Sequence, residues 1–285
     1  MTKQRALYRA VVHTSLMVGF VAIAMLYASY ILSGMSIDPK VLIVGFLEYI
    51  GIYTFNKGTD NKEDALNHPG RQEFYKSSKF PLAFGLGSCL AGLVLALTYN
   101  IYFMVLAAVP LLSVLLYGLP LVPHKLGFTR LKEVTVLKNA IVAFGWAAPI
   151  AFMPFAAMML PFSLASWAVF TILFVMVFVN TVVFDMRDVY GDRHEGVKTI
   201  PVVLGIWKTK VLLAGLTTIL ALLLVYFWST SILPPFSYLI LTNSVYTLLY
   251  LNLFGRFDPF IVCDILVDGE YLVLALVVFL GSTFL

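Results

Sequence analysis

The sequence predicts an all-α polytopic membrane protein that crosses the bilayer nine times. Hydrophobic residues make up 61% of the 285 positions, and the mean hydropathy is +0.93. Only 12% of the residues are charged, whereas a soluble domain carries about a quarter. The charged residues are also confined largely to one side of the predicted membrane. This composition argues against a soluble globular domain and excludes the disordered, fibrous and small disulfide-rich classes.

Nine apolar runs, separated by Gly, Pro, Asn or charged residues, come close to the roughly 20 residues that a helix needs to cross a bilayer. Backbone amides inside lipid must bond within their own segment, so each run is predicted to be a helix. An odd number of crossings places the termini on opposite sides. We expect residues 1–285 to form a single domain. The predicted spans are 11–33, 41–55, 80–98, 101–119, 133–153, 164–184, 208–228, 236–254 and 270–285.

The loops divide sharply by charge. Of the 19 Lys and Arg residues, only Lys40 and Lys138 fall away from the side that holds the N-terminus. The positive-inside rule makes that crowded side cytoplasmic. Among the 15 acidic residues, only Asp38 and Glu48 fall elsewhere, so we expect the polar chemistry at the cytoplasmic face. The net charge of +4 therefore reflects membrane topology and does not indicate nucleic acid binding.

Two acidic motifs follow predicted spans on this face. An i,i+4 spacing puts two carboxylates on one side of a helix, where they repel each other unless a cation neutralises them. Mg²⁺ binds one or two carboxylates while sharing its other positions with phosphate oxygens and water. Two such helix ends facing each other would form a Mg²⁺ site. The motif residues are Asn56, Asp60 and Asp64 after the second span, and Asp185, Asp188 and Asp192 after the sixth.

Basic and aromatic residues near these motifs indicate the kind of ligand. Arg71, Arg130, Lys132 and Lys198 could bind a diphosphate that bridges the metal ions. Aromatic residues lie on the same helical faces as the acids, below them in the membrane, and could hold an apolar chain or stabilise a carbocation. Packing within the bundle is an equally good reading of each ring. These aromatic residues are Tyr49, Tyr53, Phe174 and Phe178.

Other polar residues in apolar surroundings have less certain roles. Asp264 and Asp268 repeat the i,i+4 spacing but lack a following basic cluster, so we interpret them as part of a solvated loop. Glu48 is either a functional intramembrane acid or a bonding partner of a neighbouring helix. Lys138, Asn139 and Trp146 in the fifth span either line a cavity or pack against other helices. Cys89 and Cys263 are not expected to pair. The sequence does not decide between the alternative roles of Glu48, Lys138, Asn139 and Trp146.

At these motifs the chain resembles the UbiA superfamily of intramembrane prenyltransferases. Asn56, Asp60 and Asp64 match the first family motif, and Asp188 and Asp192 match the second, with Asp185 as an upstream acid seen in several branches. Further matches are Tyr117, Arg130 and Lys132 before the fifth span, and Gly196, Lys198 and Thr199 after the second motif. The chain departs from the family at residues 67–71, where Asn-His-Pro-Gly-Arg replaces the frequent Asn-Arg-Pro.

The resemblance implies a helical bundle around a central cavity, open to lipid and capped by cytoplasmic loops. It also implies Mg²⁺-dependent loss of diphosphate from an isoprenyl diphosphate donor and transfer of the prenyl group to a hydrophobic or amphipathic acceptor. Asp60, Asp64, Asp188 and Asp192 would bind Mg²⁺, with Asn56 and Asp185 in support. Arg71, Arg130, Lys132 and Lys198 would neutralise the leaving diphosphate. Tyr53, Tyr117 and Phe178 would shield the carbocation.

Two other functions compete with this interpretation. A phosphotransferase of the CDP-alcohol type also uses acidic helices and a divalent metal, but its acids lie in one run and not in two distant ones. A secondary transporter places its charges near the middle of the bilayer, on broken helices within inverted repeats. Here the acids cluster at helix ends on one side, which favours the prenyltransferase.

Overall fold

The structure, a computed structural model, describes residues 15–59, 80–118, 134–194 and 196–285. These residues form helices and no β-strand, and each of the nine predicted apolar segments contains a helix. The long helices are α2 (Leu16–Leu32), α3 (Pro39–Thr59), α6 (Phe80–Leu97), α7 (Ile101–Gly118), α8 (Leu137–Ala157), α9 (Leu164–His194), α11 (Ile206–Ser229), α12 (Leu241–Leu253) and α14 (Asp268–Phe284). Short elements are α10 (Ile200–Leu204), a 3₁₀ turn (Pro235–Ile240), α13 (Pro259–Ile261) and a π-helical turn (Val262–Val267).

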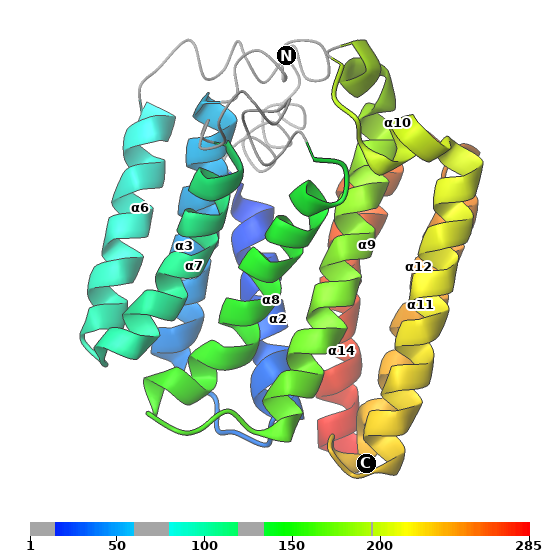
Figure 1. Cartoon of the computed structure of the whole chain (residues 1–285). Helices are drawn as coiled ribbons and strands as arrows, with labels where there is room; N and C mark the ends of the chain where they lie inside the picture. The colour runs from blue at the N-terminus through cyan, green and yellow to red at the C-terminus, as the bar shows by residue number, and fades with distance from the viewer. Residues whose placement is uncertain (1–14, 60–79, 119–133, 195) are drawn as a thin grey trace, which may run out of the picture.

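The long helices run side by side as one bundle (Figure 1). Helix α3 packs against α2 and α6, α8 lies between α7 and α9, and α11 packs against α9 and α12. Helix α14 closes the arrangement by packing against α2. Four helices, α6, α8, α9 and α11, are long and apolar enough to cross a membrane by length and composition.

Helix α8 is the central helix of this bundle. Nearly every side chain from Ala143 to Ala156 is buried, although Pro149 and Pro154 both lie inside the helix. Proline is tolerated in membrane helices where neighbouring helices and local adjustments satisfy the freed carbonyl groups. Because α8 is enclosed by its neighbours, its position in the bundle is fixed from several sides.

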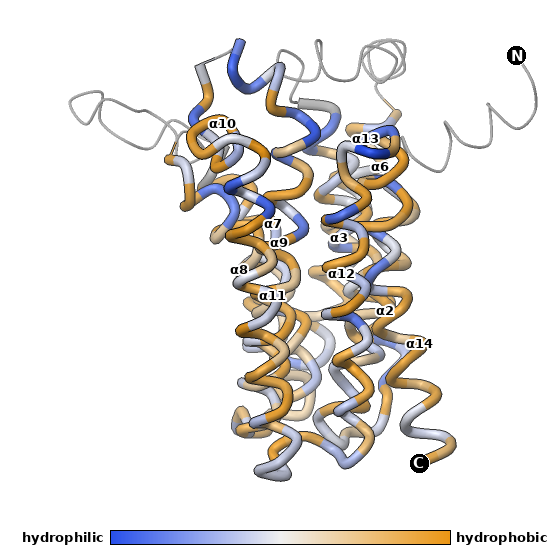
Figure 2. Tube along the Cα trace, turned by 90° about the vertical axis from the view of Figure 1, so that its right-hand side faces the viewer, coloured by the Kyte–Doolittle hydropathy of each residue, from blue (hydrophilic) through white to orange (hydrophobic). Residues whose placement is uncertain are grey.

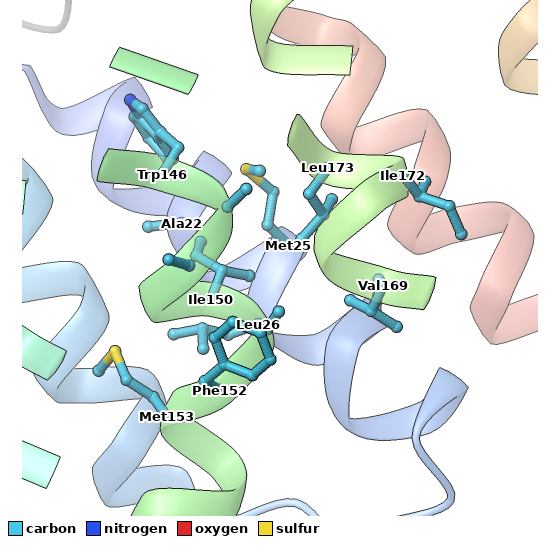
Figure 3. Close-up of a cluster of buried hydrophobic side chains, with 14 of the residues drawn as sticks. Ala22, Met25, Leu26, Trp146, Ile150, Phe152, Met153, Val169, Ile172 and Leu173 are labelled. Carbon is cyan, nitrogen blue, oxygen red and sulfur yellow. The ribbon is translucent and has the colours of Figure 1, made fainter. Parts of the chain in front are cut away.

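The main hydrophobic core lies where α2, α8 and α9 meet (Figure 3). Met25 and Leu26 of α2 lie against Ile150 of α8, and α9 contributes Ile172 and Leu173. All five side chains are almost fully buried. This core fixes α8 and α9 relative to each other. The N-terminal end of α8 and the C-terminal end of α9 both carry polar residues.

The outer surface of the bundle is apolar along most of its length. Large hydrophobic side chains are exposed on the outer helices, among them Leu90 on α6, Leu222 on α11 and Leu276 on α14. Hydrophilic stretches gather at the end of the molecule where α10 and α13 lie (Figure 2). An apolar flank of this extent indicates contact with lipid.

Helices α3 and α6 approach each other through two glycines. A Cβ atom at Gly85 would lie 2.8 Å from the backbone oxygen of Gly51 and 2.9 Å from the backbone nitrogen of Phe55. A Cβ atom at Gly51 would lie 2.7 Å from the backbone oxygen of Gly85. Small residues of this kind allow membrane helices to pack closely. The backbones are therefore in direct contact along this seam.

We expect Gly85→Ala to destabilise the protein by about 1–3 kcal/mol, the cost of forcing extra atoms into a packed interface. The clash is with backbone atoms, which cannot turn aside as a side chain can. Gly87→Ala is the matched control, because a Cβ atom at Gly87 on the same helix meets nothing within 4 Å. Thermal unfolding in detergent measures both variants. Equal midpoints for the two would contradict the close contact.

Candidate active site

The C-terminal ends of α3 and α9 reach the same end of the bundle, opposite to the end where the chain terminates (Figure 1). Helix α3 includes Asn56 and continues to Thr59, immediately before Asp60. Helix α9 continues past the predicted span 164–184 to His194, so its last three turns carry the second motif. Tyr117 lies in the last turn of α7. The predicted residues Asp60, Asp64, Arg71, Arg130 and Lys132 lie outside the described residues.

Asp185 of the second motif is bound by α8. Its carboxylate oxygens lie 2.8 Å from Lys138 Nζ and 2.9 Å from Asn139 Nδ2, and its side chain is only 6% exposed. Lys138 and Asn139, which the sequence left as either cavity-lining or packing residues, therefore join α8 to α9. Both oxygens of Asp185 bind residues of α8, so this carboxylate links α8 to α9.

Asp188 is bound by its neighbour Arg187. The guanidinium donates from Nε and Nη2 to the two oxygens of Asp188, at 2.8 and 2.9 Å, and from Nη1 to Asp264 Oδ1 at 3.2 Å. It also lies over the rings of Phe184 and Phe260, at 4.9 and 5.4 Å from their centroids. Arg187 is only 7% exposed at its side chain, so one buried cation links acids that are 76 residues apart in the chain.

The interpretation of Asp264 and Asp268 as a solvated loop is wrong. Asp264 lies in the π-helical turn, Asp268 begins α14, and both are partly buried. Asp264 pairs with Arg187 beside the second motif. The sequence argument failed because it required a basic residue nearby in the chain, whereas the basic partner comes from α9. This pair of acids therefore belongs to the surroundings of the site.

Asp192 ends the second motif and differs from the other two acids. Its Oδ2 is buried and has no hydrogen-bond partner among the described residues. Just beyond it, Gly196 adopts a φ of +75°, which glycine takes without strain, and Val197 N donates to Asp192 O at 2.8 Å. The chain thus turns back after α9, and Lys198 stays exposed there.

A hard cation such as Mg²⁺ fits the donor set at this helix end. Carboxylate oxygens are the protein ligands that it prefers, and Asp192 Oδ2 is a buried acceptor that lacks a partner in the part of the chain described. The described residues contain no group of three His, Cys, Asp or Glu side chains that could hold a metal ion by themselves. A metal site here would therefore need ligands from outside those residues, and Asp60 and Asp64 follow directly from α3.

A cavity of about 70 Å³ lies between α3, α7 and α8. Its lining is mainly apolar and aromatic, with Asn56 as a polar member near the C-terminal end of α3. Tyr53 and Phe178 both pack against the hydrophobic core, and Tyr53 also lines this cavity. The lining residues are Tyr49, Ile52, Tyr53, Asn56, Pro110, Ser113, Val114, Val142, Gly145 and Trp146.

Three aromatic residues of this cavity hold one another rigidly. Tyr49 and Trp146 stack with ring centroids 3.9 Å apart, and Trp146 Nε1 donates to Tyr53 Oη at 2.7 Å. Tyr49 Oη donates to the backbone oxygen of Gly145 at 3.0 Å. Sequence reasoning left the role of Trp146 open, and the structure shows that it both packs and lines the cavity. The cavity wall is therefore preformed.

Two further predictions concern buried residues near this region. Glu48 lies between α3 and α6 and is 1% exposed, and neither carboxylate oxygen has a partner in the described part of the chain. The structure thus shows no bond from its carboxyl group to a neighbouring helix. Cys89 and Cys263 are free, as predicted. Burial raises the pKa of the Cys263 thiol to about 12, so at neutral pH it is not a thiolate nucleophile.

Comparison with known proteins identifies the family. The family model for the UbiA prenyltransferase family matches residues 9–259. No curated protein matches the chain.

Solved structures match over nearly the whole chain. One reported for digeranylgeranylglyceryl phosphate synthase is 19% identical with a TM-score of 0.65, covering 100% of both chains. A UbiA homologue from Archaeoglobus fulgidus bound to DMAPP and Mg²⁺ is 16% identical with a TM-score of 0.65, covering 96% of this chain and 99% of that one. The apo UbiA homologue from Aeropyrum pernix K1 is 15% identical with a TM-score of 0.69, covering 92% and 96%. These likenesses establish the fold.

Proposed function

Because the chain belongs to the UbiA prenyltransferase family, we propose that this prenyltransferase moves a prenyl group from an allylic isoprenyl diphosphate to a lipid-soluble or amphipathic acceptor, with Mg²⁺ as cofactor. The observation that carries the proposal is the position of the second acidic motif at the same end of the bundle as the end of α3, above a preformed aromatic cavity. The homologue from Archaeoglobus fulgidus binds DMAPP and Mg²⁺, which supports this choice of donor and cofactor.

We assign the polar residues to the diphosphate end of the donor. Asp60, Asp64, Asp188 and Asp192 would hold Mg²⁺, which supplies positive charge for the departing diphosphate. Arg71, Arg130, Lys132 and Lys198 add further positive charge around it. Asn56 lines the cavity below and is suited to orient the substrate. Asp185 supports the site indirectly, because it fixes Lys138 and Asn139 at the end of α8.

The acidic end of the bundle and the aromatic cavity each carry one part of the proposed reaction. At the cytoplasmic end, the C–O bond of the donor breaks and its electron pair leaves with the diphosphate. In the cavity below, Tyr53 and Trp146 present aromatic rings to the allylic cation, which such faces stabilise by about 2 kcal/mol or more when water is excluded. We assign the same role to Tyr117, in the last turn of α7. A nucleophilic atom of the acceptor then bonds to the cation and gives up its proton.

We propose that all nine long helices cross the membrane and that the N-terminus and the active-site end are cytoplasmic. The asymmetry of the basic residues supports this orientation, as does the hydrophilic end seen in Figure 2. The donor then binds at the inner leaflet with its diphosphate in water and its chain among apolar side chains.

Incubation with labelled prenyl diphosphates tests the function directly. Purified protein, Mg²⁺ and a panel of quinone precursors, carotenoids, chlorins and glycerol phosphate lipids should give diphosphate release and one prenylated product. Excess chelator should stop both. Substrate translocation in vesicles without bond cleavage would favour a transporter, and release of CMP from a CDP-alcohol would favour the phosphotransferase. Continued turnover in excess chelator would contradict the Mg²⁺ requirement.

Filling the cavity should weaken donor binding. Val142 lines it, and Val142→Phe places a ring in the space proposed for the prenyl chain. We expect the apparent KM for the donor to rise by about tenfold or more, equivalent to about 1.4 kcal/mol of lost binding. Val136→Phe adds the same ring at the exposed N-cap residue of α8, six residues before Val142, and should leave the KM unchanged. Equal kinetics for the two variants would place the prenyl chain elsewhere.

A further inference from the structure

A second group of buried polar side chains lies between α9, α12 and α14, outside the proposed active site. Its centre is Glu270 in the first turn of α14, which is 1% exposed. Tyr250 Oη lies 3.1 Å from Glu270 Oε2, and Thr247 Oγ1 donates to Glu270 Oε1. Asn180 of α9 joins the group through Tyr250, whose hydroxyl lies 2.9 Å from Asn180 Oδ1. The motif-bearing helix is thus connected to the C-terminal helices.

This group has fewer hydrogens than its contacts require. Tyr250 Oη faces two acceptors, Asn180 Oδ1 and Glu270 Oε2. Thr247 Oγ1 also faces two, Glu270 Oε1 and the backbone oxygen of Asn243. Each hydroxyl carries one hydrogen, so two hydrogens serve four oxygen contacts. Two of these four contacts therefore lack a hydrogen from the hydroxyl groups.

A small cavity adjoins the same carboxyl group, with Thr217 of α11, Asn243, Ser244, Thr247 and Glu270 as its polar lining. Asn243 Oδ1 and Ser244 Oγ are buried and have no hydrogen-bond partner in the described part of the chain. Asn243 Nδ2 donates to the backbone oxygen of Glu270 at 3.0 Å, which fixes the orientation of the amide. The cavity has room for about one water-sized guest.

The charge of Glu270 indicates what this guest is. An ionised carboxylate in an apolar environment is strongly disfavoured unless a positive charge compensates it. No Lys or Arg of the described residues forms an ion pair with Glu270 within 4.0 Å. The available ligands are a carboxylate, an amide oxygen and hydroxyls, all oxygen donors of the kind that hard cations prefer. A single carboxylate balances a single charge.

We propose that this cavity binds a sodium ion, with Glu270 as its counter-charge and Asn243 Oδ1, Ser244 Oγ and Thr247 Oγ1 as further ligands. The ion supplies a positive partner for the hydroxyl oxygens of Ser244 and Thr247, the amide oxygen of Asn243 and the carboxylate of Glu270. It also ties α12 and α14 together next to Asn180 on α9. The site is separate from the catalytic one and does not depend on the proposed reaction.

Thermal unfolding of the full-length protein in detergent tests the proposal. The unfolding midpoint in NaCl is compared with the midpoint in choline chloride at the same pH and ionic strength. Chelator is present in both solutions so that no divalent ion contributes. We expect NaCl to raise the midpoint by several degrees in a saturable manner, because a ligand that binds only the folded state stabilises it. Equal midpoints of the wild-type protein in the two salts would overturn the proposal, since Glu270 would then be protonated beside a water molecule.

Two variants and a control locate the effect. Glu270→Gln should abolish the difference between the salts, and Ser244→Ala, which removes one ligand, should shift the sodium response to about tenfold higher concentration. Ser244→Ala carries the test if Glu270→Gln does not fold. Glu48→Gln is the matched control, because Glu48 is equally buried but lines neither this cavity nor the one beside α7. It should keep the full sodium response. A full response in Ser244→Ala, or its loss in Glu48→Gln, would overturn the assignment.

Discussion

Asp192→Asn is expected to lower the rate of Mg²⁺-dependent prenyl transfer by at least about a hundredfold, because it weakens binding of the Mg²⁺ that stabilises the negative charge developing on the diphosphate. Asparagine keeps the shape of the side chain but cannot supply the charge that a divalent cation requires. Asp192 is the acid of the second motif whose Oδ2 has no partner among the described residues, so a metal can use it without displacing a hydrogen bond. Single-turnover rates with labelled donor measure the loss.

Asp38→Asn is the matched control for this substitution. Asp38 lies between α2 and α3, at the end of α3 remote from Asn56, and pairs with Tyr99 at 2.6 Å. The change removes the same charge without touching the site and should leave the rate within about twofold, as expected for a distant and independent position. Isothermal titration with Mg²⁺ and a non-hydrolysable donor analogue adds a binding readout. Wild-type Mg²⁺ affinity and rate in Asp192→Asn would remove Asp192 from the metal site.

Arg187→Gln is expected to cost about 2–3 kcal/mol of stability. Loss of one partner from a buried ion pair costs about 3–5 kcal/mol, and the partial exposure of Asp188 and Asp264, 22% and 28%, reduces this figure through screening by water. Without the guanidinium, two carboxylates from different helices remain close together with no counter-charge from it. Thermal or chemical unfolding in detergent, without Mg²⁺, measures the loss.

Two comparisons separate this charge effect from simple loss of packing. The double variant Arg187→Gln with Asp264→Asn removes one of the repelling acids and should recover part of the stability. Addition of Mg²⁺ should also stabilise Arg187→Gln more than it stabilises the wild-type protein, because a cation can replace the lost charge at Asp188. If neither change helps, Arg187 contributes mainly by packing between Phe184 and Phe260.

The helices could be predicted from the sequence because lipid imposes a simple rule on apolar segments: their backbone must bond internally. The ends of the helices could not be predicted in this way. Helix α9 continues ten residues beyond the predicted span, through Asp185 and Asp192 to His194, because polar residues extend a helix into water as readily as apolar ones extend it through lipid. The spacing of the acids correctly placed the second motif on one helix.

The partners of those acids could not be predicted from the sequence. Lys138 meets Asp185 from α8, and Asp264 meets Arg187 from the turn before α14. Such pairs depend on how helices far apart in the chain pack together, and a pattern along one helix carries no information about this. For the same reason, Trp146 could not be assigned to the cavity before α3 and α8 were seen side by side.

The glycine seam between α3 and α6 restricts the routes by which apolar molecules can enter the enzyme from the bilayer. With Gly51 and Gly85 in backbone contact, no acyl or isoprenoid tail can slip between these two helices at that level. The cavity is bordered by α3, α7 and α8, so a lateral opening that admits compounds from the bilayer must lie away from this seam. Substrates and products must therefore enter and leave the cavity between other pairs of helices.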